Sequence, residues 1–281
     1  MKKNILIAGG DLRQIYCAQR LTENFNVFYT GFDKEYFSDN STVMPVSEMR
    51  GKADYAVLPI LPPDESGEIS TPLFSQTVNA RDIAPLMSEN AVIFTGMNSG
   101  KVSGFFPSHE IIAYMESEEL ALRNAIPTAE GAVMLGLENL PVTLNGTSVL
   151  IVGLGRIGTA LAHILKGFGA DITVAVRNGR GAAKAEMLGI KSVCTKDIEG
   201  KYRLVYNTVP NLIFTEKILS EFPEDTLFIE LASRPFGIDM ESAAKIGRQV
   251  IMASGLPGKT APVTAGRAVG EVIVRTIDER G

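Results

Sequence analysis

Two segments of the chain open with the same pattern: a short apolar run, a glycine turn and then a helical periodicity. The first begins with a run over 4–8 that ends in Gly9-Gly10-Asp11, and the second with a run over 148–152 that ends in GLGRIG at 153–158. A helical pattern (12–21 and 157–168) and a second apolar strand (25–30 and 171–176) follow each turn. Strand, turn, helix and strand make a βαβ unit. The chain is therefore predicted to form two α/β domains, each with a doubly wound parallel sheet.

The second glycine turn has the spacing of a dinucleotide-binding motif in the right context, between a strand and a helix. Gly153 allows the tight turn, Gly155 lets a diphosphate approach the backbone, and Gly158 lets the helix pack on the strand. The start of the helix, from Arg156 and Ile157 onward, offers N–H groups and the positive end of the helix dipole to phosphates. These residues predict a nicotinamide-dinucleotide site.

The end of the second strand decides which nicotinamide cofactor is expected. An NAD site places an acidic residue there to bind the ribose. This chain instead has Arg177, Asn178 and Arg180 at that position, and its nearest acid, Asp171, is at the other end of the strand. Two arginines suit a 2′-phosphate, so the prediction is NADP, with NAD as the alternative.

Ligands of open α/β sheets bind beyond the carboxyl ends of the strands, which selects three more segments of the second domain. Thr208 and Pro210 follow its fourth strand and are expected to border the ribose and nicotinamide. The segment 232–235 follows the fifth strand, where Ala232 and Ser233 are cofactor candidates. The segment 255–259 follows the sixth.

The remaining apolar runs complete the domain plan. Those over 55–60, 91–96 and 110–115 extend the first sheet, and those over 204–209, 227–232 and 249–254 extend the second. We expect a flavodoxin-like or Rossmann-like substrate domain over 1–118, to which the last helix, 262–281, returns. Linking helices over 119–145 lead to an NAD(P)-binding Rossmann domain over 146–261, as in D-2-hydroxyacid dehydrogenases. Pro127 is expected to interrupt the linking region, with Thr128 as the N-cap of the next helix and Glu130 in its first turn.

Composition excludes several other classes of protein. The 281 residues are 45% hydrophobic and 21% charged, which is typical of a globular protein, and the net charge of −5 argues against a general nucleic-acid binder. The two cysteines, Cys17 and Cys194, belong to no CxxC or Cys/His cluster, so no metal site is expected. No apolar run reaches the length of a membrane span. A cytoplasmic protein is the expectation.

Five segments together resemble a known family. They are NAIPTAEGA at 124–132, GLGRIG at 153–158, NTVP at 207–210, ELASRP at 230–235 and LPGKTAPVTAG at 256–266. In this order they are similar to the A subunits of dipicolinate synthases from spore-forming bacteria, over nearly the whole chain. Many members of that family read SKPGG or similar where this chain has SRPFG at 233–237, so Phe236 replaces a small residue.

The resemblance implies an activity, a partner and a setting. The family oxidises a dihydrodipicolinate-type intermediate of the lysine pathway to pyridine-2,6-dicarboxylate with NAD(P). It acts with a B subunit that resembles flavoproteins, in the mother cell during endospore formation. A homo-oligomer is also expected, because such folds are commonly dimers.

A dicarboxylate substrate requires cationic and hydroxyl donors on the loops near the predicted site. The substrate-binding candidates are Arg13, Ser99, Lys101, Arg123, Thr128, Arg234 and Lys259. Glu130 and Asp11 are the candidate proton acceptors, and a strong base is not required because the product is aromatic.

Two other functions remain open at this point. An NAD(P)-dependent 2-hydroxyacid dehydrogenase would need a catalytic histidine in the C-terminal region, but the chain has only His109 and His163. The second alternative is a non-catalytic, cofactor-binding subunit of a flavoprotein complex.

Overall fold

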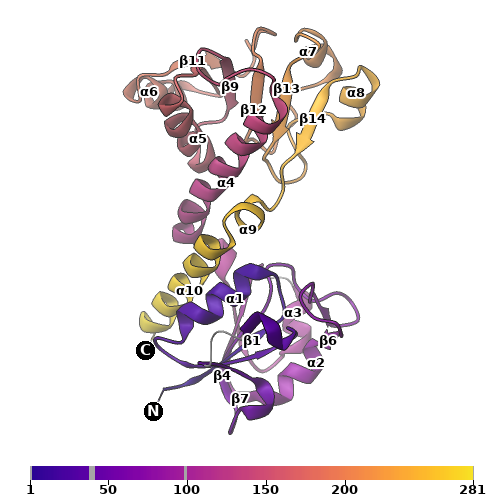
Figure 1. Ribbon diagram of the computed structural model, residues 1–281, viewed down its shortest axis with the longest axis vertical. Helices are drawn as coiled ribbons and strands as arrows, with labels where there is room; N and C mark the ends of the chain where they lie inside the picture. Colours follow the sequence, from indigo (N-terminus) through magenta and orange to yellow (C-terminus); the bar gives the residue numbers. More distant parts are fainter. Residues whose placement is uncertain (1, 38–41, 98–99, 281) are drawn as a thin grey trace. The chain divides into compact units, whose positions relative to one another are not determined.

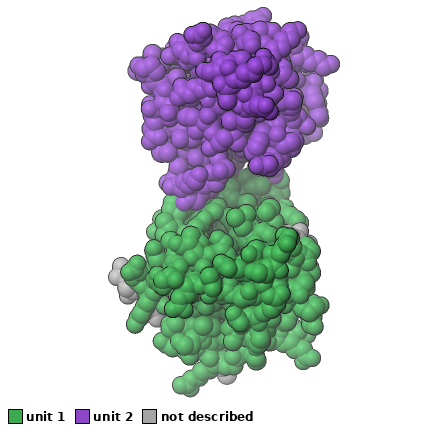
Figure 2. All heavy atoms as spheres, turned by 90° about the vertical axis from the view of Figure 1, so that its right-hand side faces the viewer, with its two compact units in different colours: residues 1–124, 261–281 green, residues 125–260 purple. Residues whose placement is uncertain are grey.

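The computed structural model describes residues 2–37, 42–97 and 100–280, which form two compact units. Unit 1 comprises residues 1–124 and 261–281, and unit 2 comprises residues 125–260 (Figure 2). The last helix of the chain thus belongs to the first unit. Each unit has one parallel sheet of six strands.

The sheet of unit 1 has the strand order β3-β2-β1-β4-β7-β8, and all its pairs are parallel. Its strands are β1 (Asn4–Ala8), β2 (Asn26–Thr30), β3 (Val43–Pro45), β4 (Ala53–Val57), β7 (Met87–Thr95) and β8 (Glu110–Ala113). A small hairpin of β5 (Glu68–Ile69) and β6 (Val78–Asn79) stands apart from this sheet. The helices are α1 (Leu12–Leu21), α2 (Ala80–Ile83), α3 (Gly100–Phe105) and α10 (Pro262–Asp278). Apolar clusters fill both faces, as buried parallel strands require.

The returning helix α10 lies beside α1 in unit 1 (Figure 1). The approach is close because glycines of α10 face α1: a Cβ at Gly266 would stand 2.3 Å from the carbonyl oxygen of Arg13. An ion pair adds to this contact, since Arg20 Nε lies 2.6 Å from Glu271 Oε1. Close backbone packing therefore joins the first and the last helix of the chain.

Unit 2 repeats the same strand order, β11-β10-β9-β12-β13-β14, which is that of a Rossmann domain. The strands are β9 (Ser148–Val152), β10 (Asp171–Val176), β11 (Lys191–Cys194), β12 (Leu204–Asn207), β13 (Leu227–Glu230) and β14 (Gln249–Met252). The helices are α5 (Arg156–Gly167), α6 (Gly179–Met187), α7 (Glu216–Ser220), α8 (Met240–Lys245) and α9 (Leu256–Thr260). The predicted fold class, two doubly wound parallel α/β domains, is confirmed.

In the segment of sequence that links the two sheets, one prediction was wrong. Instead of two linking helices separated at Pro127, a single helix, α4 (Glu118–Asn139), contains the proline. Thr128 is therefore not an N-cap, and Glu130 lies in the helix interior rather than in a first turn. A proline inside a helix costs about 3 kcal/mol. Burial of Ala129, Ala132 and Val133 in the core of unit 2 offsets this cost.

No helix in the described part of the chain has the length and apolarity that crossing a membrane requires.

Candidate functional site

The glycine turn of unit 2 has the conformation that its sequence predicts. Gly153 has a φ of 91°, in the region that side chains disfavour, and a Cβ there would stand 2.6 Å from Thr208 Oγ1. A Cβ at Gly158 would stand 2.1 Å from the carbonyl oxygen of Gly153, so only glycine lets α5 pack against the turn. Among the described residues, no atom beyond the chain neighbours lies within 4 Å of a Cβ at Gly155. The turn is thus closed on its strand side and open at Gly155.

The start of α5 is electrostatically positive. The N-cap of α5 is Gly155, and the helix begins with Arg156 and Ile157. No acidic residue lies in its first turn. The first N–H groups of a helix lack partners within it and carry the positive end of the dipole. This arrangement suits an anion such as a diphosphate.

A cavity of about 470 Å³ adjoins this turn. It lies at the carboxyl ends of β9, β10, β11 and β12, where the strand order reverses. Its lining comprises Gly153, Leu154, Ala175, Val176, Arg177, Gly181, Thr195, Val209, Asn211 and Ile213. Arg177 thus reaches the cavity, at the position where NAD sites carry an acid.

The other cofactor candidates differ in their surroundings. Asn178 caps α6, since its side chain accepts a hydrogen bond of 3.1 Å from the N–H of Gly181, while Arg180 is exposed in the first turn of that helix. The Thr208 hydroxyl donates to the carbonyl of Val152 at 2.7 Å, which ties β12 to β9. Pro210 is exposed.

Of the ten lining residues, the sequence predicted Gly153 and Arg177 as cofactor-binding. Thr195, Asn211 and Ile213 are among the eight that it did not predict. Thr195 follows β11, a strand of four residues of which two are exposed, so its apolar signal is weak. Asn211 and Ile213 lie in a loop beyond NTVP, and no sequence signal there indicates a ligand.

Glu230 organises the loop that carries Ser233 and Arg234. This carboxylate is 1% exposed and accepts four hydrogen bonds. Oε1 accepts from Asn207 Nδ2 at 2.7 Å and from the N–H of Ala232 at 2.9 Å. Oε2 accepts from the N–H groups of Gly237 at 2.9 Å and Ile238 at 3.1 Å. Glu230 therefore ties the ends of β12 and β13 to both ends of the loop.

Within this loop, the ring of Phe236 lies beside the guanidinium of Arg234. The distance from Arg234 Cζ to the ring centroid is 5.5 Å, within the range of a cation–π contact. Phe236 has a φ of 67°, which is rare for an aromatic residue. Phe236 therefore occupies a left-handed backbone conformation.

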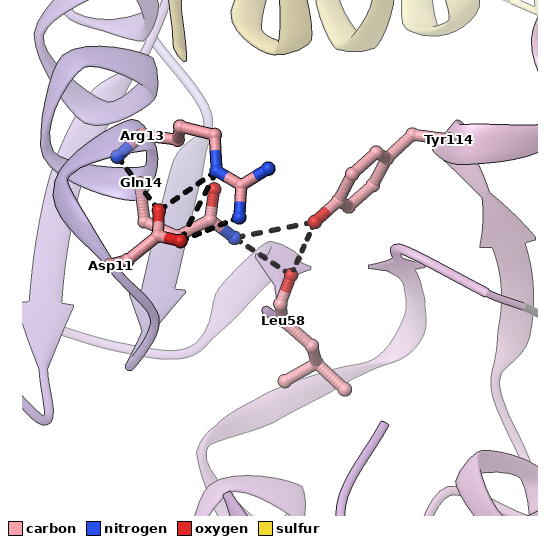
Figure 3. A network of polar contacts seen from close by, with 5 residues as sticks. All are labelled: Asp11, Arg13, Gln14, Leu58 and Tyr114. Carbon is pink, nitrogen blue, oxygen red and sulfur yellow. Dashed lines mark hydrogen bonds and ion pairs between the residues drawn. The ribbon is translucent and has the colours of Figure 1, made fainter. Parts of the chain in front are cut away.

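The glycine turn of unit 1 holds a different set of polar contacts (Figure 3). Asp11 caps α1 because its carboxylate accepts a hydrogen bond from the N–H of Arg13 at 3.0 Å. The Arg13 guanidinium also donates to this carboxylate, with Nε 2.9 Å from Oδ1. Burial alone would raise the pKa of Asp11, but the hydrogen bonds and charge of Arg13 outweigh it and lower that pKa below its usual value. Asp11 and Arg13 thus bind each other, which weakens Asp11 as a base.

Behind this pair, Gln14 and Tyr114 both donate to the carbonyl of Leu58, at 2.8 and 3.1 Å (Figure 3). Burial raises the pKa of the Tyr114 phenol, so it remains a neutral donor. The contact joins α1 to the residues that follow β4 and β8.

The remaining substrate candidates are mostly exposed. Lys101 lies 3.3 Å from Glu65, and Arg123 lies 2.8 Å from Glu119, one turn earlier in α4. Ser99 lies outside the described residues. In unit 2, Lys259 is exposed in α9 and Glu130 is exposed on α4, whereas Thr128 is half-buried. In the described part of the chain, no group of three His, Cys, Asp or Glu side chains is arranged to hold a metal ion.

These features define an α/β oxidoreductase with a nicotinamide-dinucleotide-binding domain. In agreement, residues 128–234 match the family model of the NAD-binding domain of D-isomer specific 2-hydroxyacid dehydrogenases. Residues 4–115 match the model of the N-terminal domain of the dipicolinate synthase A subunit.

Relatives extend the likeness over the whole chain. The A subunit of dipicolinate synthase from Bacillus subtilis is 29% identical over 98% of this chain and 96% of its own length. The crystal structure of the dipicolinate synthase A subunit from Bacillus halodurans has a TM-score of 0.87 at 28% identity, covering 98% of this chain and 97% of that one. The resemblance seen in the sequence is therefore confirmed. A transhydrogenase from Sinorhizobium meliloti, 13% identical with a TM-score of 0.73 over 99% of this chain and 94% of that one, shares the fold alone.

Proposed function

We propose that this protein forms dipicolinate by transferring a hydride from a dihydrodipicolinate-type ring to NADP, or to NAD. One observation carries the proposal: the likeness to the A subunit of a dipicolinate synthase covers 98% of the chain. The cofactor cavity of unit 2 agrees with it, because an oxidation of this kind needs a hydride acceptor.

The diphosphate of the cofactor would bind at Gly155 and the first N–H groups of α5, those of Arg156 and Ile157. Arg177, which lines the cavity, would bind the 2′-phosphate of NADP. Asn178, Arg180, Thr208, Pro210, Ala232 and Ser233 remain our expected neighbours of the adenosine and nicotinamide ends. When bound, the nicotinamide ring accepts the hydride.

The proposed reaction balances without a metal or a second oxidant. The dihydro ring loses one hydride to the nicotinamide and one proton, and the product is an aromatic pyridine. Because aromatisation drives the reaction, a carboxylate exposed to solvent suffices as the proton acceptor, and we assign that role to Glu130. Asp11 is the weaker choice, since Arg13 lowers its pKa.

The carboxylates of the substrate require cations whose guanidinium or ammonium groups are held in place. In unit 2 we assign this role first to Arg234, whose loop is anchored by Glu230 and whose guanidinium lies beside Phe236. Lys259 and Thr128 are further candidates in that unit. In unit 1 the candidates are Lys101, Arg123 and Arg13, of which Arg13 already holds Asp11.

The resemblance further implies a partner and a setting. We propose that the chain acts with a flavoprotein-like B subunit, associates with copies of itself, and works in the mother-cell cytoplasm of a spore-forming bacterium.

A coupled assay tests this function. The aldol product of pyruvate and aspartate semialdehyde is supplied to the purified chain with NADP or NAD, with and without the B subunit. We expect the absorbance of dipicolinate to rise together with that of the reduced cofactor. The Arg234→Ala variant should lose most turnover and still bind NADPH, whereas Lys217→Ala, at an exposed site on α7, should behave as the wild type. Absence of product with both cofactors and the partner present would rule out the proposal.

A second candidate is a 2-hydroxyacid dehydrogenase, because residues 128–234 match the NAD-binding domain of that family. The sequence speaks against it, since no histidine follows His163. Turnover of simple 2-hydroxy acids in the absence of dipicolinate formation would favour it. A third, non-catalytic function would be favoured if the complex with the B subunit formed product equally well after cofactor binding by this chain had been abolished.

A further inference from the structure

Lys184 of α6 binds the glycine turn of unit 2. Its Nζ donates to the carbonyl oxygen of Leu154 at 2.9 Å and to Thr159 Oγ1 at 2.8 Å. The Thr159 hydroxyl in turn donates to the carbonyl oxygen of Gly155 at 2.6 Å. Two successive carbonyl groups of the turn are therefore held by one half-buried ammonium group, the first directly and the second through a hydroxyl.

Because the peptide bond is planar, the contact at the Leu154 carbonyl also sets the direction of the Gly155 N–H. In a trans peptide, the C=O and the following N–H point in opposite directions. Because the Leu154 carbonyl accepts from Lys184 Nζ, the N–H of Gly155 points away from that ammonium group. Gly155 is also the open position of the turn, where no described atom beyond its chain neighbours lies within 4 Å of a Cβ. The N–H is thus presented where a diphosphate can approach.

Lys184 also adds a positive charge next to the start of α5, which carries no acidic residue in its first turn. Lys184 is not among the residues that line the cavity, whereas Leu154 and, one turn earlier on α6, Gly181 are. An effect of Lys184 on a ligand would therefore pass mainly through the backbone of the turn.

We propose that Lys184, with Thr159, is a positioning residue that fixes the glycine turn in the conformation that binds the diphosphate of a dinucleotide. This inference rests on the proposed cofactor site. It assigns a role to a residue of the second helix of the Rossmann unit that the glycine motif itself does not include.

The test compares ligands with and without a diphosphate. The chain has no tryptophan, so NADPH fluorescence reports binding directly, and calorimetry measures ADP and adenosine. We expect Lys184→Met to weaken binding of NADPH and ADP about tenfold, the factor for one lost hydrogen bond to a charged group, and to leave adenosine binding within about twofold. Lys184→Arg should retain binding. Thr159→Val keeps the contact between Lys184 and Leu154, and its affinity for NADPH and ADP should fall about threefold.

Lys191→Met is the matched control, because Lys191 is an exposed lysine of the same unit that pairs with Asp171. It removes the same charge and should leave all three affinities unchanged. Thermal melting of each variant verifies that it is folded. If Lys184→Met does not fold, the Thr159→Val and Thr159→Ser pair decides, with Ser expected to match the wild type.

The outcomes separate this inference from the proposed function. A wild-type chain that binds neither NADPH nor NADH overturns both. A wild-type chain that binds NADPH, together with folded Lys184 or Thr159 variants of unchanged affinity, overturns the positioning role alone. Equal weakening of adenosine and ADP also overturns it, because the cavity as a whole would then have changed.

Discussion

Asn207 and Glu230 end neighbouring strands of unit 2, and their side chains join at 2.7 Å, from Asn207 Nδ2 to Glu230 Oε1, beneath the loop that carries Arg234. Both residues are buried, at 0% and 1% exposure. Because all four bonds to Glu230 come from N–H donors, the site requires an acceptor at both oxygens.

Replacing Glu230 by glutamine should therefore destabilise unit 2. The new amide group would face two N–H donors in either orientation, which costs about 2–4 kcal/mol. Urea unfolding followed by circular dichroism measures the change. Glu224→Gln, at an exposed carboxylate near β13, should stay within about 0.5 kcal/mol of the wild type. A stable Glu230→Gln variant would show that the loop is anchored elsewhere.

Arg177→Asp should change the cofactor preference. The substitution removes a cation from the cavity lining and supplies the acid that binds a free ribose. We expect NADPH to bind at least tenfold more weakly and NADH to bind as well or better, measured as the ratio of dissociation constants. Lys217→Asp makes the same change of charge at an exposed site and serves as the control. An unchanged ratio would mean that another residue reads the 2′-phosphate.

Phe236→Gly and Phe236→Ala together test the backbone strain at residue 236. Both variants lose the ring, but alanine keeps a Cβ at a φ of 67° and glycine does not. The glycine variant should therefore be more stable than the alanine variant by about 1 kcal/mol in thermal or urea unfolding. At an ordinary helical or extended position the order would be reversed.

Gly266→Ala should destabilise unit 1. A Cβ there would stand 2.3 Å from the carbonyl oxygen of Arg13, and a backbone oxygen cannot move aside. Overpacking of this kind costs about 1–3 kcal/mol, more than alanine gains in helix propensity. Gly104→Ala in α3 is the matched control, since no described atom beyond its chain neighbours and its own helix lies within 4 Å of a Cβ there. It should be neutral or slightly stabilising.

The pair of Asp11 and Arg13 should make stability depend on pH in the acid range. Because the pKa of Asp11 is lower in the folded protein than its usual value of 3.8, the ionised pair stabilises the fold above that pH. The stabilisation is lost as the pH falls through the folded pKa. The carboxylate is partly exposed, so Asp11→Asn should cost less than about 1 kcal/mol at pH 7, and the difference should vanish at acid pH. Arg13→Gln should give the same pH dependence, and a difference independent of pH would contradict the ion-pair account.

Much of the fold was predictable because its signals are local. The starts of β1 and β9, the turns that follow them and the apolar runs of the buried strands each lie within a short stretch of sequence. Short strands have weaker local signals: β3, with three residues, was missed, and β11, with four, was counted as the third strand of its sheet but not located. The continuous helix α4 was also missed, because burial of its residues in the core of unit 2 outweighs the local effect of Pro127.

For the candidate site, the sequence by itself determined the glycine turn, the positive start of α5 and the arginine at the end of β10, since spacing along one βαβ unit places all three. Only the tertiary structure decided that Lys184 holds that turn, that Glu230 anchors the Arg234 loop, and that Arg13 lowers the pKa of Asp11. The physical reason is that hydrogen bonds and ion pairs depend on distances of a few ångströms between side chains, and these distances are set by the packing of separate elements and not by the order of residues.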